Sequence, residues 1–215
     1  MGEKVKGTAV RDARPLAERV YDLVCDDIVN GTLAPGAQLV QDQLAADYGV
    51  SRMPVRDVLT RLVHEGMADF IPGRGYFVKV LSYADVIDVY EVRREVEALA
   101  IRRFEGRYSP MELARLEMSL VEAEAVTDAD FDEIFRTSTD FHLALVAPCP
   151  NKYMLHSLQG IWENPVQRRI IRSYKNDGAK AAGVAAKHRR LLGLARAGKT
   201  EELIKELASC HTPDT

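Results

Sequence analysis

The chain has 215 residues, of which 47% are hydrophobic and 28% charged, and its formal net charge is −3. This length suits one large domain or two small ones, and the composition is ordinary for a soluble globular protein. No apolar run reaches the roughly 20 residues that span a bilayer, and the polar N-terminus lacks the apolar core of a signal peptide. Three scattered cysteines without a CxxC pair argue against a disulfide framework. We therefore predict a cytoplasmic protein with no membrane partner.

Residues 1–14 are polar and are predicted to be disordered. A helix is predicted from Leu16 to Asn30, between Pro15 and Gly31. Its predicted buried face consists of the apolar residues that recur at helical spacing: Leu16, Val20, Leu23, Val24 and Ile28.

The segment from Leu44 to Val78 carries the most informative pattern. It predicts a short helix, a tight turn at Gly49, a second helix and a β-hairpin whose tip is Pro72-Gly73-Arg74-Gly75. Ser51 is a suitable N-cap for the second helix, because its hydroxyl can accept a hydrogen bond from a backbone N–H of the first turn. The apolar residues of that helix recur at helical spacing: Val55, Val58, Leu59 and Leu62. This order of elements predicts a winged helix-turn-helix.

Arg52 and Arg56 are four residues apart, so they share a face of the second helix that points away from its apolar stripe. Such a helix suits the major groove of DNA, where guanidinium groups reach phosphates and guanine edges. Residues 1–80 contain 3 Lys and 7 Arg against 11 Asp and Glu, a net charge of −1. DNA binding would therefore depend on locally clustered arginines, which a dimer would double: Arg52, Arg56, Arg61 and Arg74.

This part of the chain resembles the GntR family of bacterial transcription regulators. The similarity begins at IVNGTLAPGAQL (Ile28–Leu39) and continues through LAADYGVSRMPVRDVLTRLVHEGM to PGRGYFV. In this family the Ser-Arg-x-Pro-Val-Arg segment opens the recognition helix. The resemblance implies DNA contacts from six residues of that helix and of the wing tip: Ser51, Arg52, Met53, Arg56, Gly73 and Arg74. One departure is that members often carry a basic residue near the start of the preceding helix, where this chain has Val40-Gln41-Asp42-Gln43.

After residue 80 the sequence predicts helices only. Ser82 is a suitable N-cap for a helix from Tyr83 to about Arg103, and Ser109-Pro110-Met111-Glu112 has the form of a capping box. Further helices are predicted over about 130–146, from Asn151 onward with a break at Asn164-Pro165, and over 179–197 and 201–211. The predicted fold class is mainly α, with a winged helix-turn-helix at residues 15–80 and an all-α bundle of six or seven helices at residues 82–215.

His142, His188 and His211 fall on three different predicted helices of this bundle. Neutral imidazoles that converge inside a helical bundle can hold a divalent metal such as Zn²⁺, Ni²⁺ or Mn²⁺. The alternative is that these histidines are satisfied within the core or reach solvent, which is also how we interpret His64 and His156. Cys210 is an alternative third ligand, because its thiolate could bind a soft metal.

The C-terminal part resembles the FCD ligand-binding domain of the FadR branch of the GntR family. The similar segments are DVYEVRREVEALAIR, STDFHLALV, NKYMLHSL and KHRRLLGLARAG. Many FCD domains hold a metal with three histidines and an Asp or Asn one helical turn before the first histidine. The resemblance implies that His142 and His188 belong to this set. Counting from Gly198 aligns the family's last histidine with Cys210, and we assign His211 as the third ligand by residue type. Ser138 stands where the Asp or Asn would be, so a bound metal would be held more weakly than usual.

Arg93 occupies the position where FCD domains carry an arginine that often faces the effector cavity. A buried arginine there could bind the carboxylate of a small organic acid through two hydrogen bonds. The alternative is an ion pair with Glu97, one helical turn further on. Arg168, Arg169 and Arg172 form a basic stripe that we interpret as a solvated face rather than as an anion site.

The leading hypothesis is a homodimeric regulator that binds a double-stranded DNA operator, most commonly as a repressor, and senses a small organic acid in its helical bundle. Effector binding would shift the population between two arrangements of the DNA readers. A rival is a metal-dependent hydrolase built on the bundle, although the chain has no HExxH motif. A third hypothesis is a winged-helix protein-interaction module, which only the acidic charge balance favours.

Overall fold

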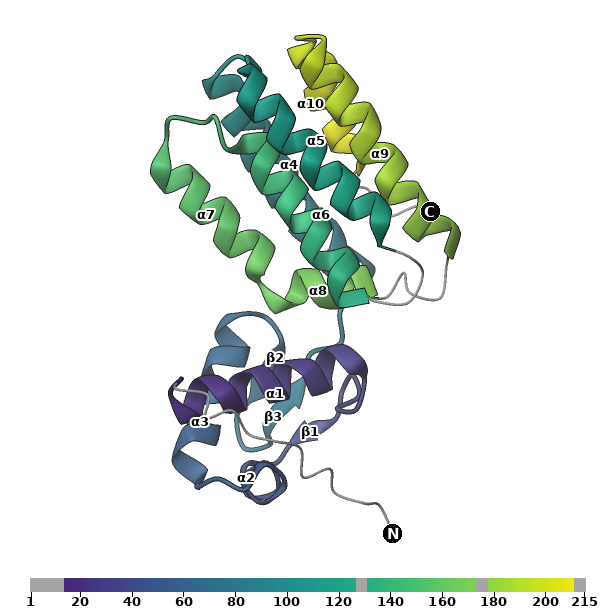
Figure 1. The fold of residues 1–215 in the computed structure, drawn as a ribbon. Helices are drawn as coiled ribbons and strands as arrows, with labels where there is room; N and C mark the ends of the chain where they lie inside the picture. Colours follow the sequence, from purple (N-terminus) through teal and green to yellow (C-terminus); the bar gives the residue numbers. More distant parts are fainter. Residues whose placement is uncertain (1–13, 127–130, 173–177, 211–215) are drawn as a thin grey trace. The chain divides into compact units, whose positions relative to one another are not determined.

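The computed structural model describes residues 14–126, 131–172 and 178–210, so the predicted disorder of residues 1–14 concerns a segment that, apart from Arg14, lies outside it. Ten helices and three short strands occur within the described residues (Figure 1). The chain divides into two compact units, Met1–Lys79 and Val80–Thr215. The fold class predicted from the sequence, a winged helix-turn-helix followed by an all-α bundle, is confirmed.

The N-terminal unit contains three helices, α1 (Leu16–Asn30), α2 (Gln41–Tyr48) and α3 (Arg52–His64). Both α1 and α2 pack against α3, which buries the four residues predicted from its periodicity: Val55, Val58, Leu59 and Leu62. Gly49 ends α2 at φ 67°, a left-handed conformation that costs a glycine little. The turn joins α2 directly to α3, and α1 and α2 together cover one face of α3 and leave its opposite face exposed.

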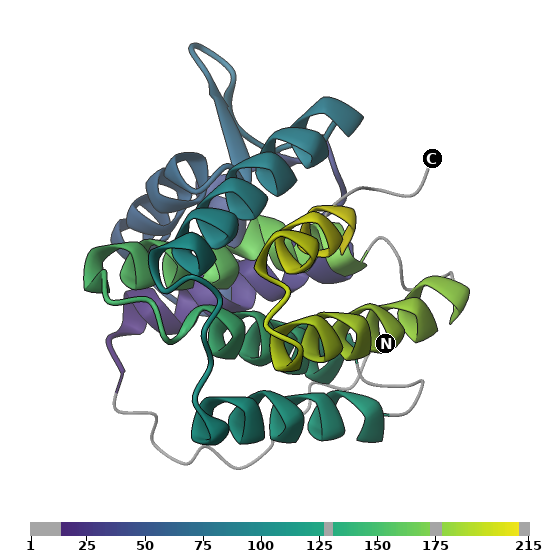
Figure 2. The same cartoon turned by 90° about the horizontal axis from the view of Figure 1, so that it is seen from above.

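Three strands complete the unit. The expected hairpin forms from β2 (Ala68–Ile71) and β3 (Gly75–Val78), paired antiparallel with Phe70 opposite Tyr76. A third strand, β1 (Gln38–Leu39), pairs with the other edge of β3, so the order is β1-β3-β2. Figure 2 shows the hairpin extending beyond the helices of its own unit. The sequence did not predict β1, because two residues are too short to show an alternating pattern.

The buried face of α1 differs from the predicted one. Leu16 and Leu23 are exposed, whereas Tyr21 and Cys25 are buried beside the expected Val20, Val24 and Ile28. The physical reason is a specific contact with the end of α3. The Tyr21 hydroxyl donates to a carboxylate oxygen of Glu65, and the guanidinium carbon of Arg61 lies 3.5 Å from the centroid of the Tyr21 ring.

The C-terminal unit consists of seven helices within the described residues. They are α4 (Tyr83–Arg103), α5 (Pro110–Ala125), α6 (Phe131–Val146), α7 (Lys152–Glu163), α8 (Pro165–Arg172), α9 (Gly178–Arg196) and α10 (Thr200–Cys210). In the ribbon, α5, α6 and α9 run side by side, and α10 returns along α9 (Figures 1 and 2). The largest side chains of the shared core include Phe141, Leu145, Leu191 and Leu207.

Local hydrogen bonds begin the helices at the expected residues. Ser82 and Asp85 form a reciprocal capping box at α4, and Ser109 and Glu112 form another at α5. The side chain of Asn151 accepts from two backbone N–H groups at the start of α7. The predicted break is also observed, because α7 ends at Glu163 and α8 starts at Pro165. These signals are local in sequence, which is why the helix starts could be predicted well.

The loop between α4 and α5 is held against the start of α10. The Thr200 hydroxyl donates to the backbone carbonyl of Glu105 at 2.8 Å. Gly106 follows with φ 59°, and a Cβ added there would lie 2.5 Å from Oγ1 of Thr200. A glycine is required at this position both for its backbone conformation and for the space.

We expect Gly106→Ala to lower the free energy of unfolding by about 2–3 kcal/mol, from left-handed strain of about 1–2 kcal/mol and the clash with Thr200. Gly198→Ala is the matched control, because Gly198 has a similar φ of 66° with no heavy atom within 4 Å of an added Cβ. It should cost only the backbone part. Urea unfolding measures both values, and equal losses would show that the contact with Thr200 does not matter.

Candidate functional site: the recognition helix and a buried polar cluster

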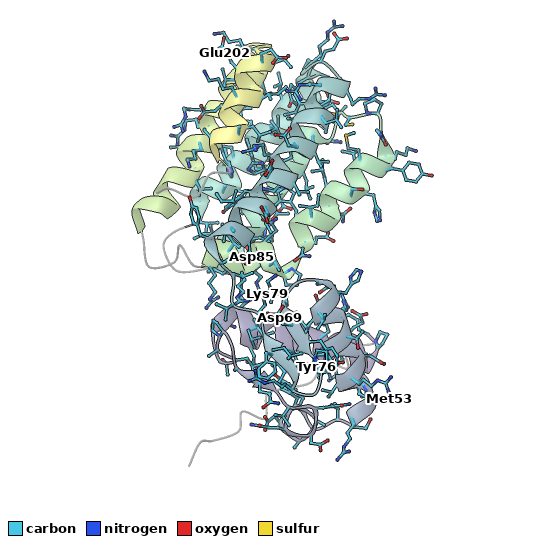
Figure 3. All side chains as sticks on the ribbon, turned by 180° about the vertical axis from the view of Figure 1, so that it is seen from behind. Met53, Asp69, Tyr76, Lys79, Asp85 and Glu202 are labelled. Atoms are coloured by element: carbon cyan, nitrogen blue, oxygen red, sulfur yellow. The ribbon has the colours of Figure 1, made fainter. Side chains whose placement is uncertain are left out.

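The exposed face of α3 carries the side chains predicted to contact DNA. Ser51 occupies the N-cap position with an extended backbone, but its hydroxyl makes no capping hydrogen bond, contrary to our expectation. Ser51 therefore lies at the N-terminus of α3, but its side chain does not stabilise the helix by capping. Met53 is 73% exposed and points away from the body of the unit (Figure 3). Arg52 and Arg56 are exposed on the same side, as predicted.

An ion pair that the sequence did not predict joins α2 to the first residue of α3. Nε of Arg52 lies 2.5 Å from Oδ1 of Asp42, and Nη2 donates to Oδ2 at 2.9 Å. Nε2 of Gln41 donates to the backbone carbonyl of Arg52 at 2.8 Å. Arg52 is thus held through both its side chain and its main chain by two consecutive residues of α2.

Arg61 is exposed, but the sequence did not predict that its charge is paired within the N-terminal unit. Its guanidinium pairs with Glu18 at 3.0 Å and with Glu65 at 2.8 Å, and it lies over the Tyr21 ring. Glu18 lies on α1 and Glu65 is the C-cap residue of α3. Arg61 therefore joins α1 to the C-terminal end of α3. The other arginines expected to form the local positive charge are also exposed. Arg52 and Arg56 lie on α3, and Arg74 lies at the hairpin tip.

The tip of the β2–β3 hairpin carries an exposed arginine between two glycines. Gly73 and Gly75 adopt φ values of 76° and 94°, and Arg74 between them is exposed. The backbone N–H of Arg74 donates to Ile71, and its carbonyl accepts a hydrogen bond from Gln38 at 2.8 Å. The main chain of the tip is therefore fixed, and the guanidinium carbon of the exposed Arg74 lies 5.4 Å from the centroid of the Phe77 ring on β3.

Two charged side chains are buried one turn apart on α4. Arg93 is 3% exposed and Glu97 is fully buried. Nη1 of Arg93 donates to Oε1 of Gln167 on α8 at 2.9 Å, and its guanidinium carbon lies 4.0 Å from the centroid of the Trp162 ring. Nε1 of Trp162 in turn donates to Oε1 of Glu97 at 2.7 Å. The arrangement connects α4, α7 and α8 through directional contacts.

Two of the three predicted metal-binding histidines come together beside this network. His142 on α6 and His188 on α9 are both buried, and their ring centroids are 5.1 Å apart. Oε1 of Glu97 lies 3.4 Å from Nδ1 of His142. Phe141 stacks on the His188 ring with a centroid separation of 4.3 Å. The exposed His64 and His156 take no part, in line with their interpretation.

The donor chemistry fits part of a metal site. Two imidazoles suit Zn²⁺ or Ni²⁺, and buried Ser138, one turn before His142 on α6, offers only a weak neutral oxygen. Within residues 14–126, 131–172 and 178–210, no group of three His, Cys, Asp or Glu side chains is placed to hold a metal. His211 and the side chain of Cys210 lie outside the described residues, so a full ligand set would depend on one of them.

Arg168, Arg169 and Arg172 are partly buried rather than fully solvated, which corrects the sequence interpretation. Among the described residues, Nη1 of Arg169 is buried without a hydrogen-bond partner, whereas Arg168 and Arg172 have local partners. Nη2 of Arg168 lies 2.7 Å from Oδ1 of Asp132 on α6, and the guanidinium carbon of Arg172 lies 5.1 Å from the Phe131 ring centroid. These contacts attach α8 to the start of α6. Gln167, on the buried side of the same helix, was missed as a site residue, because a glutamine gives no sequence signal without knowledge of what faces it.

Similarity to known proteins agrees with this geometry. Residues 16–78 match the sequence pattern of the bacterial regulatory proteins of the gntR family, and residues 88–211 match the FCD domain. The chain is 29% identical over 199 residues to YdhC, an HTH-type transcriptional regulator of Bacillus subtilis (strain 168). The aligned region covers 92% of this chain and 88% of YdhC. It is 28% identical over 145 residues to RspR, an HTH-type transcriptional repressor of Escherichia coli (strain K12), which covers 66% of this chain and 64% of RspR.

Among solved structures, the fold resembles a GntR transcriptional regulator from Rhodococcus sp. RHA1. The TM-score is 0.68 at 24% identity, over 90% of this chain and 92% of that one. No helix within the described residues is long and apolar enough to cross a bilayer. With both of its units matched in chain order, the protein belongs to the gntR family: it is a transcriptional regulator with a DNA-binding winged helix-turn-helix and an FCD ligand-binding domain.

Proposed function

We propose that the protein is a homodimeric repressor that binds a short palindromic operator, with Arg52 and Arg56 in the major groove and Arg74 at the minor groove. The observation that carries this proposal is the two-sided α3, whose apolar face is buried while its arginines are exposed. RspR, a relative over about two thirds of the chain, is named a repressor. Exposed apolar side chains on α5, at Met111, Met118 and Val121, are of the kind that a second copy covers.

We further propose that a small organic acid is the effector and that Arg93 binds its carboxylate. The guanidinium is buried and its Nη1 is bonded to the neutral amide of Gln167, which a carboxylate would replace with a stronger charge-assisted pair. The alternative is that Arg93 is held chiefly by Glu97, which is buried one turn further along α4. The effector would act by binding one arrangement of the two readers better than the other, which changes operator affinity by that difference.

A divalent metal bound by His142, His188 and His211, with Ser138 nearby, is part of the same proposal. When bound, it would supply a Lewis acid with open positions for an effector carboxylate. The relatives are transcriptional regulators, which favours a sensing role for such a site over hydrolysis.

We expect Arg52→Ala and Arg56→Ala each to weaken binding to an operator selected by the parent protein. Loss of an arginine that reads a base should cost about 1–3 kcal/mol and relax the preference at one base pair. Loss of a phosphate contact should instead weaken all sequences alike and reduce the salt slope by about one unit. Arg19→Ala is the control, because it removes the same charge from an exposed position on α1. Parent-like binding by both α3 variants would refute the assignment of the reader, and absence of any DNA binding would favour a protein-interaction module.

For the metal, we expect substoichiometric content after mild purification, because Ser138 is a weak ligand. Ser138→Asp should raise the content measured by mass spectrometry, since it adds a charged oxygen on the same helix face. His142→Ala should abolish binding, whereas His156→Ala, which removes an exposed histidine from α7, should leave it unchanged. Full occupancy that survives His142→Ala would rule out this site. If Cys210→Ala removes the metal and His211→Ala does not, the cysteine is the third ligand.

For the effector, small organic acids should raise the melting temperature more than their amides do in a thermal-shift screen. Arg93→Met should remove the response to the acids, since it deletes the cation that pairs with the carboxylate. Arg94→Met, which changes the neighbouring and more exposed arginine of α4, should respond like the parent. Equal stabilisation by acid and amide, or a normal response from Arg93→Met, would place the ligand elsewhere.

A further inference from the structure

We propose that Asp42 is a positioning residue that sets the orientation of Arg52 and thereby makes the protein discriminate more strongly at one base pair of its operator. This inference rests on the proposed role of Arg52 as a DNA reader. Asp42 lies in the first turn of α2 and is the acidic residue of the segment Gln41-Asp42-Gln43.

The geometry leaves the recognition end of Arg52 available. A guanidinium has five N–H groups, and Asp42 engages one from Nε and one from Nη2. The end of the guanidinium, with both protons of Nη1 and the second proton of Nη2, remains directed away from the carboxylate. Two parallel N–H groups of this kind match O6 and N7 of guanine. The Asp42 carboxylate therefore uses one edge of the guanidinium and presents the other.

Main-chain geometry supports the same role. Gln41 bonds to the carbonyl of Arg52, so both ends of this residue are attached to α2. A free arginine side chain samples many rotamers, and fixing it before binding reduces the entropy lost in the complex. The two side chains of the pair are 72% and 60% exposed, so the pair contributes little to folding stability. Its expected effect is on recognition.

The negative charge also acts against non-specific binding. Affinity for any DNA sequence depends on neutralising phosphates, and a carboxylate beside a reader arginine opposes that attraction. Residues 1–80 already have a net charge of −1. Asp42 would thus lower the affinity for all DNA while it raises the difference between the operator and its variants, which is the quantity that defines specificity.

The experiment uses the full-length protein and an operator that the parent selects from random double-stranded DNA. Dissociation constants are measured for this operator, for each single-base variant and for random DNA, with the parent and with Asp42→Asn. Asp42→Asn should bind random DNA several-fold more tightly, because one negative charge is lost. Its discrimination should fall about tenfold, and only at the base pair where Arg52→Ala also loses discrimination.

Asp47→Asn is the matched control, because it removes the same charge from an exposed position of the same helix. It should bind random DNA more tightly while keeping the discrimination of the parent. Asp42→Glu, which restores the charge, should recover part of the discrimination. In the Arg52→Ala background, Asp42→Asn should change discrimination no further, since the double-mutant cycle removes the partner through which Asp42 acts.

Two results would overturn the inference. If Asp42→Asn and Asp47→Asn behave alike, Asp42 contributes only charge, and if Asp42→Asn raises discrimination, the carboxylate masks Arg52 instead of orienting it. Unchanged melting temperatures would exclude misfolding as the cause of any difference. A different failure concerns the proposed function alone: if Arg52→Ala keeps full discrimination at every base pair, Arg52 is not a base reader.

Discussion

The burial of two opposite charges one turn apart on α4 constrains how the helices of the C-terminal unit can pack. Moving an ion into a protein interior costs several kcal/mol unless hydrogen bonds and nearby charges compensate. Arg93 and Glu97 receive such compensation from Gln167 on α8 and Trp162 on α7. Hydrogen bonds require donor–acceptor distances and angles within narrow ranges, so these contacts add a directional constraint to the close packing of the apolar core. The register of α7 and α8 against α4 therefore depends on them.

The same constraint connects helix packing to ligand sensing in the function that we propose. His142 lies next to Glu97 and His188 packs against His142, so a metal or a carboxylate bound there would act on the contacts that set helix positions. A ligand that competes with Gln167 for Arg93 would change the attachment of α8, which also pairs with α6 through Arg168 and Asp132. Binding energy can then be converted into a shift of packed helices.

In the N-terminal unit, the arrangement of charges matters more than their sum. The net charge of residues 1–80 is −1, yet carboxylates neutralise specific arginines and leave others exposed. Arg61 is used between α1 and α3. Within the described residues Arg56 forms no ion pair, and Arg52 is held by one edge only. A composition-based argument would have placed this unit among proteins that do not bind nucleic acid.

Much of the fold could be predicted from the sequence, because its signals are local. The caps at Ser82, Ser109 and Asn151, the glycine turn after α2, and the periodicity of α3 each involve residues within a few positions of one another. The predicted convergence of histidines was met for His142 and His188, while His211 lies outside the described residues. The face of α1 and the role of Arg61 could not be predicted, since they depend on contacts between residues far apart in sequence: Tyr21 with Glu65, and Glu18 with Arg61.

By itself, the sequence determined the kinds and order of the helices, the winged reader and the residues that α3 exposes, because periodicity, caps and turn glycines act over one or two helical turns. Only the tertiary structure decided which charged side chains meet: Asp42 with Arg52, Gln167 with Arg93, and Glu97 with both Trp162 and His142. These pairs join residues from different helices. Their distances depend on how whole helices pack, and no local pattern in the chain carries that information.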